Sequence, residues 1–248
     1  MTVLPVYALP FRTTFLIFII FSFIGWVSEV LYVGIFFEHR FVNRGFLHGP
    51  ICPIYGLGGL SILLLPQQLY STWFQLFCAS MLLGTIVEYL SSWILEKLFH
   101  TRWWDYSHYK FNIHGRVCLL NSLLFGALGL VIIHFIQPQV MKLLSLFSDT
   151  VLKVSAAVLA LAFVTDLLIT LRRLVDFSVS MAKLAAIREN LSRRFNRKEE
   201  FTAALHKKLE SLQPRLKNIE SFMHRFPTIK SINYKEMLLE LKERLFKK

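Results

Sequence analysis

The chain has 248 residues, of which 54% are hydrophobic and only 18% charged, and its mean hydropathy is +0.49. This composition is more apolar than that of soluble domains and excludes an ordinary soluble globule. The net charge of +12 is unevenly spread: residues 172–248 carry 19 Lys and Arg against 9 Asp and Glu, whereas residues 1–171 carry 9 against 7. We therefore expect a transmembrane domain over residues 1–171 and a basic tail over residues 172–248.

Familiar signatures of metal sites and enzymes are missing from the sequence. The three cysteines show no CxxC spacing, and the histidines match no common metal-ligand pattern. No Walker A loop, GxSxG or HExxH motif is present, which weighs against an ATPase or a hydrolase. We expect no metal and no cofactor, and we assign no catalytic residue.

Five apolar segments approach the roughly 20 residues that a helix needs to cross a hydrocarbon core of about 30 Å. The second segment is short and rich in Pro and Gly, which favours a short, broken or re-entrant helix. Since residues 1–10 lack a basic segment and a cleavage site, the first segment is expected to be retained. The sequence thus predicts an all-α polytopic membrane protein with about five transmembrane helices, spanning approximately residues 11–37, 51–65, 72–95, 117–136 and 150–171.

Basic residues in the short connections predict the orientation in a plasma (inner) membrane. Cytoplasmic loops retain Lys and Arg. The first and third connections are rich in them, whereas the second has none and the fourth has only Lys142. We expect the N-terminus outside and the tail in the cytoplasm. The basic residues of the two rich connections are Arg40, Arg44, Lys97, Arg102, Lys110 and Arg116.

The tail has apolar residues at helical spacing, including Leu184, Ile187 and Leu191, and prolines at 214 and 227 divide it. This pattern predicts a helical hairpin or coiled coil with a solvated basic face. Two other roles stay open: docking of a cytoplasmic protein such as an ATPase, and adhesion to anionic lipid. Acidic residues are interspersed among the basic ones, which argues against nucleic acid as a partner.

Three acidic residues, Glu29, Glu88 and Asp166, lie inside predicted spans, where a charge costs about 2.5 to 3.5 kcal/mol on insertion scales. Such residues are candidates for function. We expect a structural role for Asp166, because Arg172 and Arg173 follow within two turns.

Glu29 and Glu88 each lie on a stripe of small or polar residues at helical spacing, so we expect spans one and three to share an interior face. The alternative is that each carboxylate is neutral or is held by a structural arginine such as Arg44 or Arg116. The stripes consist of Ser22, Gly25 and Tyr32 around Glu29, and of Gly84, Thr85, Ser91 and Ser92 around Glu88.

The first and third connections are unlike ordinary loops. The first combines Gly and Pro with Asn, Arg and His, which bind anions or move protons. In the third connection, Trp103 suits a membrane interface, whereas Trp104, Asp105 and Tyr106 favour a polar-ligand site or a structural clamp. The candidate substrate-binding or polar-core residues are Glu29, Asn43, Arg44, His48, Glu88, Ser92, Trp104, Asp105, Tyr106, Asn112, Arg116 and Asn121.

Over about residues 13–137 the sequence resembles the ABC-transporter type IV (CmpB-like permease) family of small bacterial integral membrane proteins. The resemblance implies a multi-pass plasma-membrane protein and points to the permease half of a transporter, without giving a substrate. It rests on Gly25-Trp26 with Glu29, residues 43–47, 49–50 and 52–56, Glu88-Tyr89, residues 93–99 and 103–107, and Asn112 with Gly115-Arg116.

Three functions are compatible with these features. The first is a permease-like subunit, oligomeric, that handles an anionic solute or lipid and recruits an ATPase through its tail. The second is a membrane-embedded enzyme that acts on a lipid headgroup or a lipid-linked substrate. The third is a scaffold or regulator whose basic tail is the active part.

Overall fold

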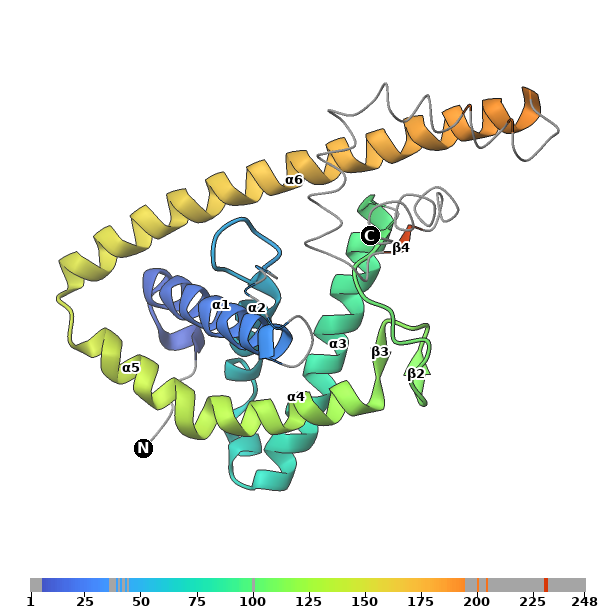
Figure 1. Cartoon of the computed structure of the whole chain (residues 1–248). Coiled ribbons are helices and arrows are strands. Elements are labelled where there is room, and N and C mark those ends of the chain that lie inside the picture. Colours follow the sequence, from blue (N-terminus) through green and yellow to red (C-terminus); the bar gives the residue numbers. More distant parts are fainter. Residues whose placement is uncertain are drawn as a thin grey trace. The chain divides into compact units, whose positions relative to one another are not determined.

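The computed structural model describes residues 6–35, 39, 41, 43, 45–99, 101–194, 200, 204 and 230–231. Helices dominate these residues (Figure 1). The α-helices are α1 (Phe11–Val33), α2 (Pro53–Leu63), α3 (Trp73–Phe99), α4 (Leu119–Val131), α5 (Gln137–Ser145) and α6 (Asp149–Arg194). Short elements between and beside them are η1 (Val6–Ala8), η3 (Gln67–Tyr70), the π-helical turn η4 (Ile132–Ile136) and the strands β1 (Thr101–Arg102), β2 (Asn112–Ile113), β3 (Val117–Cys118) and β4 (Lys230–Ser231).

The chain forms two compact units. Unit 1 comprises residues 1–93 and 106–170, and unit 2 comprises residues 94–105 and 171–248. Two small antiparallel pairings accompany the helices: β2 pairs with β3 in unit 1, and β1 pairs with β4 in unit 2. The boundary expected between a transmembrane domain and a basic tail, at residue 171, stays a prediction.

Four helical stretches of the described residues are long and apolar enough to cross a membrane. They are Phe11–Val33, Trp73–Phe99, Leu119–Ser145 and Asp149–Arg194, and α2 is a shorter apolar helix. The predicted helical membrane fold and its short second element are therefore confirmed. Helix α2 begins at a proline, which is favoured in the first turn of a helix, and its glycines lie inside it. Glycines are tolerated in a membrane helix where neighbouring helices cover its backbone.

The fourth span is longer than predicted. The sequence predicts an end near residue 136, but in the structure α5 continues the helix through Pro138 to Ser145. A proline inside an α-helix removes one hydrogen bond, and its ring collides with the carbonyl four residues earlier. The wider π-helical turn η4 directly precedes this proline and makes room for it.

The fifth span also extends beyond its predicted end. Helix α6 has 46 residues, which corresponds to about 69 Å at 1.5 Å per residue. It runs through the first part of the predicted tail, where a helix was expected. The coiled coil and the later helices predicted for the tail lie outside the described residues.

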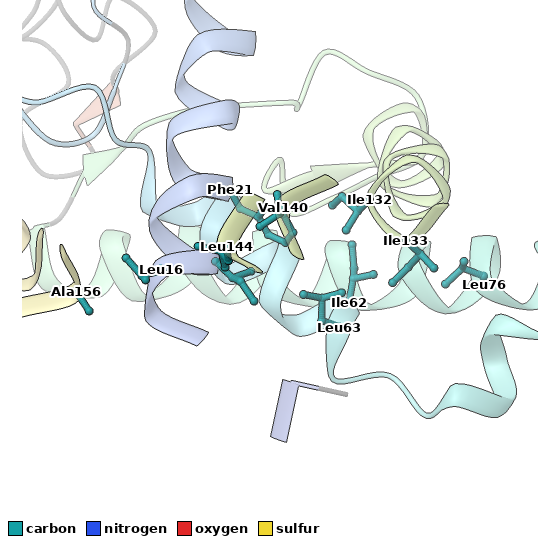
Figure 2. Packing of buried hydrophobic residues seen from close by; sticks show 11 residues of the cluster. Leu16, Phe21, Ile62, Leu63, Leu76, Ile132, Ile133, Val140, Leu144 and Ala156 are labelled. Atoms are coloured by element: carbon teal, nitrogen blue, oxygen red, sulfur yellow. The ribbon is translucent and has the colours of Figure 1, made fainter. Parts of the chain in front are cut away.

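A cluster of buried apolar side chains holds one end of unit 1 together (Figure 2). It joins residues near the beginnings of α1, α3 and α6 (Leu16, Leu76 and Ala156) to residues near the ends of α2 and α5 (Leu63 and Leu144). Successive membrane helices of unit 1 therefore alternate in direction. We call this the apolar end of unit 1 and the opposite one the polar end.

Helices α1 and α2 pack closely because glycines remove side chains from their contact, and Figure 1 shows them side by side. A Cβ atom at Gly25 would overlap the ring of Tyr55. One at Gly56 would overlap Ser22 Oγ and lie 2.7 Å from the backbone oxygen of Phe18. Small residues at such crossings let helix backbones approach in an apolar environment.

Helices α3 and α4 use the same device. A Cβ atom at Gly84 would lie 2.7 Å from Cβ of Phe125, and Thr85 Oγ1 donates a hydrogen bond of 2.7 Å to Ser122 Oγ. The small-residue stripes of spans one and three thus pack on α2 and α4, respectively. The expectation that these two stripes form one shared face stays a prediction, and Tyr32 of the first stripe is exposed. Each stripe packs against the next membrane helix in the chain, which runs antiparallel to it.

A pair of alanine substitutions tests the α1–α2 crossing. Gly56→Ala is expected to destabilise the protein by about 1–3 kcal/mol, because the new methyl group meets the backbone of α1. Gly58→Ala is the matched control: nothing lies within 4 Å of its added Cβ, and alanine favours the helix by up to about 1 kcal/mol. Thermal unfolding in detergent, followed by circular dichroism, measures both. Equal effects of the two variants would contradict the proposed crossing.

Candidate functional site

A carboxylate of α1 is hydrogen-bonded to a tyrosine of α2 at the polar end of unit 1. Tyr55 Oη donates to Glu29 Oε2 over 2.9 Å. Glu29 lies near the end of α1 and Tyr55 in the first turn of α2, so the antiparallel packing brings them together. The contact connects the two helices that the Gly25 crossing holds in place.

A second carboxylate, that of Glu88 in α3, is bound in a similar way. Its Oε1 accepts hydrogen bonds from Tyr106 Oη over 3.1 Å and from Asn121 Nδ2 over 3.4 Å. Glu88 is only 7% exposed, and its Oε2 has no hydrogen-bond partner among the described residues. This oxygen is a buried acceptor available to a ligand.

The two carboxylate–tyrosine pairs lie at the same end of unit 1. We call Glu29, Tyr55, Glu88, Tyr106 and Asn121 the carboxylate–tyrosine centre. Four of its five members were predicted as site residues. The hydrogen bonds that the structure shows at Glu29 and Glu88 come from phenols and an amide.

The phenol of Tyr106 remains protonated and serves as a donor. Burial, and then the negative charge of Glu88, raise the pKa of Tyr106 well above its ordinary value of 10. Both effects disfavour the phenolate, the first by desolvation and the second by repulsion. The hydrogen bond from Tyr106 to Glu88 therefore persists over the physiological pH range.

Arg116 is buried beside this centre on the segment that follows β2. Its guanidinium lies 5.4 Å from the ring centroid of Tyr89, the residue after Glu88 in α3. Such a cation–π contact holds a positive charge in a poorly hydrated place. Arg44, the other arginine predicted for the site, lies outside the described residues.

The Pro- and Gly-rich connection before α2 is fixed to α1 by Asn43. Its Oδ1 accepts hydrogen bonds from Trp26 Nε1 over 2.8 Å and from the backbone N–H of Gly45 over 3.1 Å. Its Nδ2 donates to the backbone oxygen of His48 over 2.9 Å.

The same connection is fixed to α6 by Asp166. The backbone N–H groups of His48 and Gly49 donate to its two carboxylate oxygens over 3.0 and 2.7 Å. His48 Nδ1 lies 3.0 Å from Asp166 Oδ1 and 3.0 Å from Thr170 Oγ1. These contacts, and not an arginine, are the partners of Asp166 that the structure shows.

The remaining predicted site residues have varied surroundings. Ser92 is buried one turn after Glu88. Asn112 stabilises the β2–β3 hairpin and the turn before it: its side-chain amide donates to the backbone oxygen of Tyr109 and accepts from the backbone N–H of Gly115. Trp104 and Asp105 are half-buried members of unit 2, and their part in a site stays a prediction.

Trp103, for which we expect an interfacial role, is buried in unit 2 and packs edge-on against Phe99 with ring centroids 5.8 Å apart. In the described parts of the chain, no group of three or more His, Cys, Asp and Glu residues is arranged to hold a metal ion.

Tyr55 and Thr170 are members of these arrangements that the sequence did not indicate. Tyr55 lies in the stretch that carries the family resemblance, and its surroundings in α2 are apolar residues and glycines, so nothing in the sequence distinguished it. Thr170 precedes the basic residues of α6. The contacts of both residues join segments far apart in the sequence, 26 residues for Tyr55 and 122 for Thr170.

The raised pKa of Tyr106 predicts a dependence of stability on alkaline pH. Above pH 10 the unfolded chain releases the Tyr106 proton while the folded chain keeps it, so the free energy of unfolding falls as the pH rises. Tyr106→Phe removes this part of the alkaline loss and, at pH 7, destabilises the protein by about 1–3 kcal/mol because the buried carboxylate loses a donor.

Thermal unfolding in detergent between pH 7 and 11 measures both effects. Tyr109→Phe serves as the control, because this neighbouring tyrosine is exposed. An alkaline stability loss in Tyr106→Phe as steep as in the wild-type chain would contradict the assignment.

Comparison with known proteins agrees with these features. The family model described as "Putative ABC-transporter type IV" matches residues 16–171, more than half of the chain. No curated protein and no solved structure matches the chain. The matched range contains the whole carboxylate–tyrosine centre together with His48 and Asp166. The chain therefore belongs to the ABC-transporter type IV (CmpB) family of membrane proteins.

Proposed function

We propose that the chain is the permease subunit of a transporter and that the carboxylate–tyrosine centre binds part of its solute. One observation carries the proposal: two carboxylates from different apolar helices, Glu29 and Glu88, are each oriented by a tyrosine at the same end of unit 1. Acidic residues inside membrane helices are costly, and proteins use them for solute and ion pathways.

The centre has a free acceptor for a ligand. Glu88 Oε2 is buried and without a hydrogen-bond partner among the described residues, and leaving such an atom unsatisfied costs about 1–3 kcal/mol or more. A solute hydroxyl or ammonium group that donates to this oxygen would recover that energy. Tyr106 and Asn121 occupy the other oxygen and fix the direction in which Oε2 faces.

Arg116 supplies the positive charge for an anionic group on the same solute or lipid. Its guanidinium lies over the ring of Tyr89, the residue after Glu88. Guanidinium groups form bidentate hydrogen bonds with carboxylates and phosphates. A solute that carries both a donor group and an anionic group, such as a headgroup-like molecule, fits an acceptor and a cation at neighbouring positions. This is the chemistry that we propose for the transported compound.

The energy source and the full pathway require other chains. We propose that the basic tail recruits a cytoplasmic ATPase and that the subunits assemble as a homo-oligomer in the plasma membrane, with the N-terminus outside. The chain contains no Walker A motif of its own. The four spans and one short helix found among the described residues also show no evident internal repeat, so a second copy or a partner would be needed to enclose a path.

Substitution of the two carboxylates tests the solute site. Glu88→Gln is expected to reduce retention of co-purifying polar solute or lipid about ten- to hundredfold, since hydrogen bonds to a charged group contribute about 1.5–3 kcal/mol. Glu29→Gln should act in the same direction. The full-length chain is purified from native membranes by mild solubilisation, and bound small molecules are identified by mass spectrometry.

Glu189→Gln is the matched control, because Glu189 is exposed and pairs with Arg193 on α6. Retention is compared at equal amounts of membrane-inserted protein. Unchanged retention in both carboxylate variants would contradict the site, and a variant that fails to accumulate would indicate a structural role for that carboxylate.

Deletion of residues 195–248 tests recruitment through the tail. We expect an ATPase to co-purify in stoichiometric amounts with the full chain and to be lost after the deletion, while bound solute is retained. A homo-oligomer that carries a specific phospholipid and no ATPase would contradict the transporter and favour an enzyme acting on lipid. Complete loss of solute as well as partner would favour the tail-centred scaffold.

A further inference from the structure

The contact between the imidazole of His48 and the carboxylate of Asp166 is not part of the proposed solute site. Asp166 lies on α6, and its two carboxylate oxygens accept the backbone N–H groups of His48 and Gly49. The ring of His48 turns back onto the same carboxylate, with Nδ1 at 3.0 Å from Oδ1. One acidic side chain thus fixes both the backbone and the imidazole of a residue 118 positions away.

This arrangement determines where the neutral imidazole carries its hydrogen. The carboxylate accepts N–H donors on both oxygens, so it is the acceptor toward the ring as well, and Nδ1 carries the hydrogen. Thr170 Oγ1, also 3.0 Å from Nδ1, donates its own hydrogen to Asp166 Oδ1 over 3.3 Å. In a neutral imidazole the second nitrogen is then a lone-pair acceptor. For His48 this is Nε2.

Nε2 of His48 is buried and has no hydrogen-bond partner among the described residues. We propose that this atom is a proton-binding site of unit 1, with Asp166 as its positioning residue. The same logic operates where a carboxylate orients a histidine so that the far nitrogen exchanges protons. The proposal goes beyond solute binding and does not depend on Glu29 or Glu88.

Protonation of His48 takes its proton from solvent. Transfer of a proton from hydronium to Nε2 forms an N–H bond, leaves water, and converts the ring to imidazolium. The positive charge then faces the Asp166 carboxylate, which is the titratable group in contact with the ring among the described residues. Thr170 is the other side chain in contact with the ring, and it carries no charge.

A protonated His48 differs from the neutral ring in what it offers to a ligand. The neutral ring presents an acceptor at Nε2, and the imidazolium presents a donor and a positive charge there. Since the connection that carries His48 also leads into α2 and Tyr55, proton binding and the carboxylate–tyrosine centre lie on one continuous segment.

Nitrogen-15 NMR of the full chain tests the proposal without knowledge of a solute. The chain is labelled at the histidine ring nitrogens and placed in lipid nanodiscs, and His48→Gln identifies the His48 signals. With the ring neutral, we expect a protonated Nδ1 and an unprotonated Nε2. On acidification the Nε2 resonance should shift to the imidazolium position, and Nδ1 should move little.

Asp166→Asn is expected to increase the share of rings with the hydrogen on Nε2, because the neutral amide has a single acceptor oxygen, for which the backbone N–H groups of His48 and Gly49 compete with Nδ1–H. Thr170→Val keeps the carboxylate and should preserve the wild-type tautomer. His134, stacked on Trp73 at 4.7 Å, serves as an internal reference that none of these changes should affect.

Two results would overturn the proposal: a wild-type ring with its hydrogen on Nε2, or a ring that stays neutral on acidification while the chain remains folded. If Asp166→Asn does not fold, the wild-type and Thr170→Val spectra still decide between the two tautomers. Loss of solute retention in the carboxylate variants leaves these spectra unchanged, so the two proposals fail independently.

Discussion

Acidic side chains inside apolar helices cannot rely on water, so each needs donors from another part of the chain, and unit 1 is organised around meeting that need. Glu29 of α1 takes its donor from Tyr55 of α2, and Glu88 of α3 takes its donors from a loop tyrosine and from α4. Asp166 of α6 takes its donors from the connection before α2. An unpaired buried polar group costs several kcal/mol in an apolar medium. Every membrane helix of unit 1 is therefore connected to a neighbour by at least one polar contact at the polar end.

Packing at the opposite end is of a different kind. The apolar end is held by side chains such as Leu16, Leu63 and Leu76, with no directional contact among them, whereas the crossings nearer the polar end depend on Gly25 and Gly56. Between lipid-facing helices the hydrophobic effect contributes little, and close contact and hydrogen bonds decide which helices associate. The glycines bring the backbones together, and this approach puts the tyrosines within reach of the carboxylates.

Two kinds of chemistry result at the polar end. The carboxylate–tyrosine centre offers a fixed acceptor, and Arg116 offers a nearby cation, which together suit a solute with a donor and an anionic group. The His48–Asp166 pair offers a nitrogen whose hydrogen-bonding character changes with one proton. Membership of the ABC-transporter type IV family places both on a membrane protein, and the permease proposal gives each a use: one for recognition and one for proton binding.

The sequence by itself determined the features that local composition controls. Long apolar runs predicted the four long apolar helices and the short second one that the described residues form. The length and hydropathy of a helix can be read from its own residues, without knowing which helices it contacts. The cost of a charge in lipid likewise marked Glu29, Glu88 and Asp166 as candidates before any contact was visible. The ends of the helices were harder to predict: Pro138 normally ends a helix, and only the wider turn of η4 before it allows the helix to continue.

Tertiary structure alone decided which residues meet. Tyr55 and Thr170 have no distinguishing sequence pattern, since a tyrosine in an apolar, glycine-rich segment and a threonine before basic residues are both ordinary. Periodicity shows which face of a helix is polar, but it does not show which neighbour that face will meet, and the packing of the two stripes on α2 and α4 became visible only in the structure. The partner of Asp166 was missed for the same reason: nearby arginines were visible in the sequence, whereas His48 becomes its neighbour only when the helices pack.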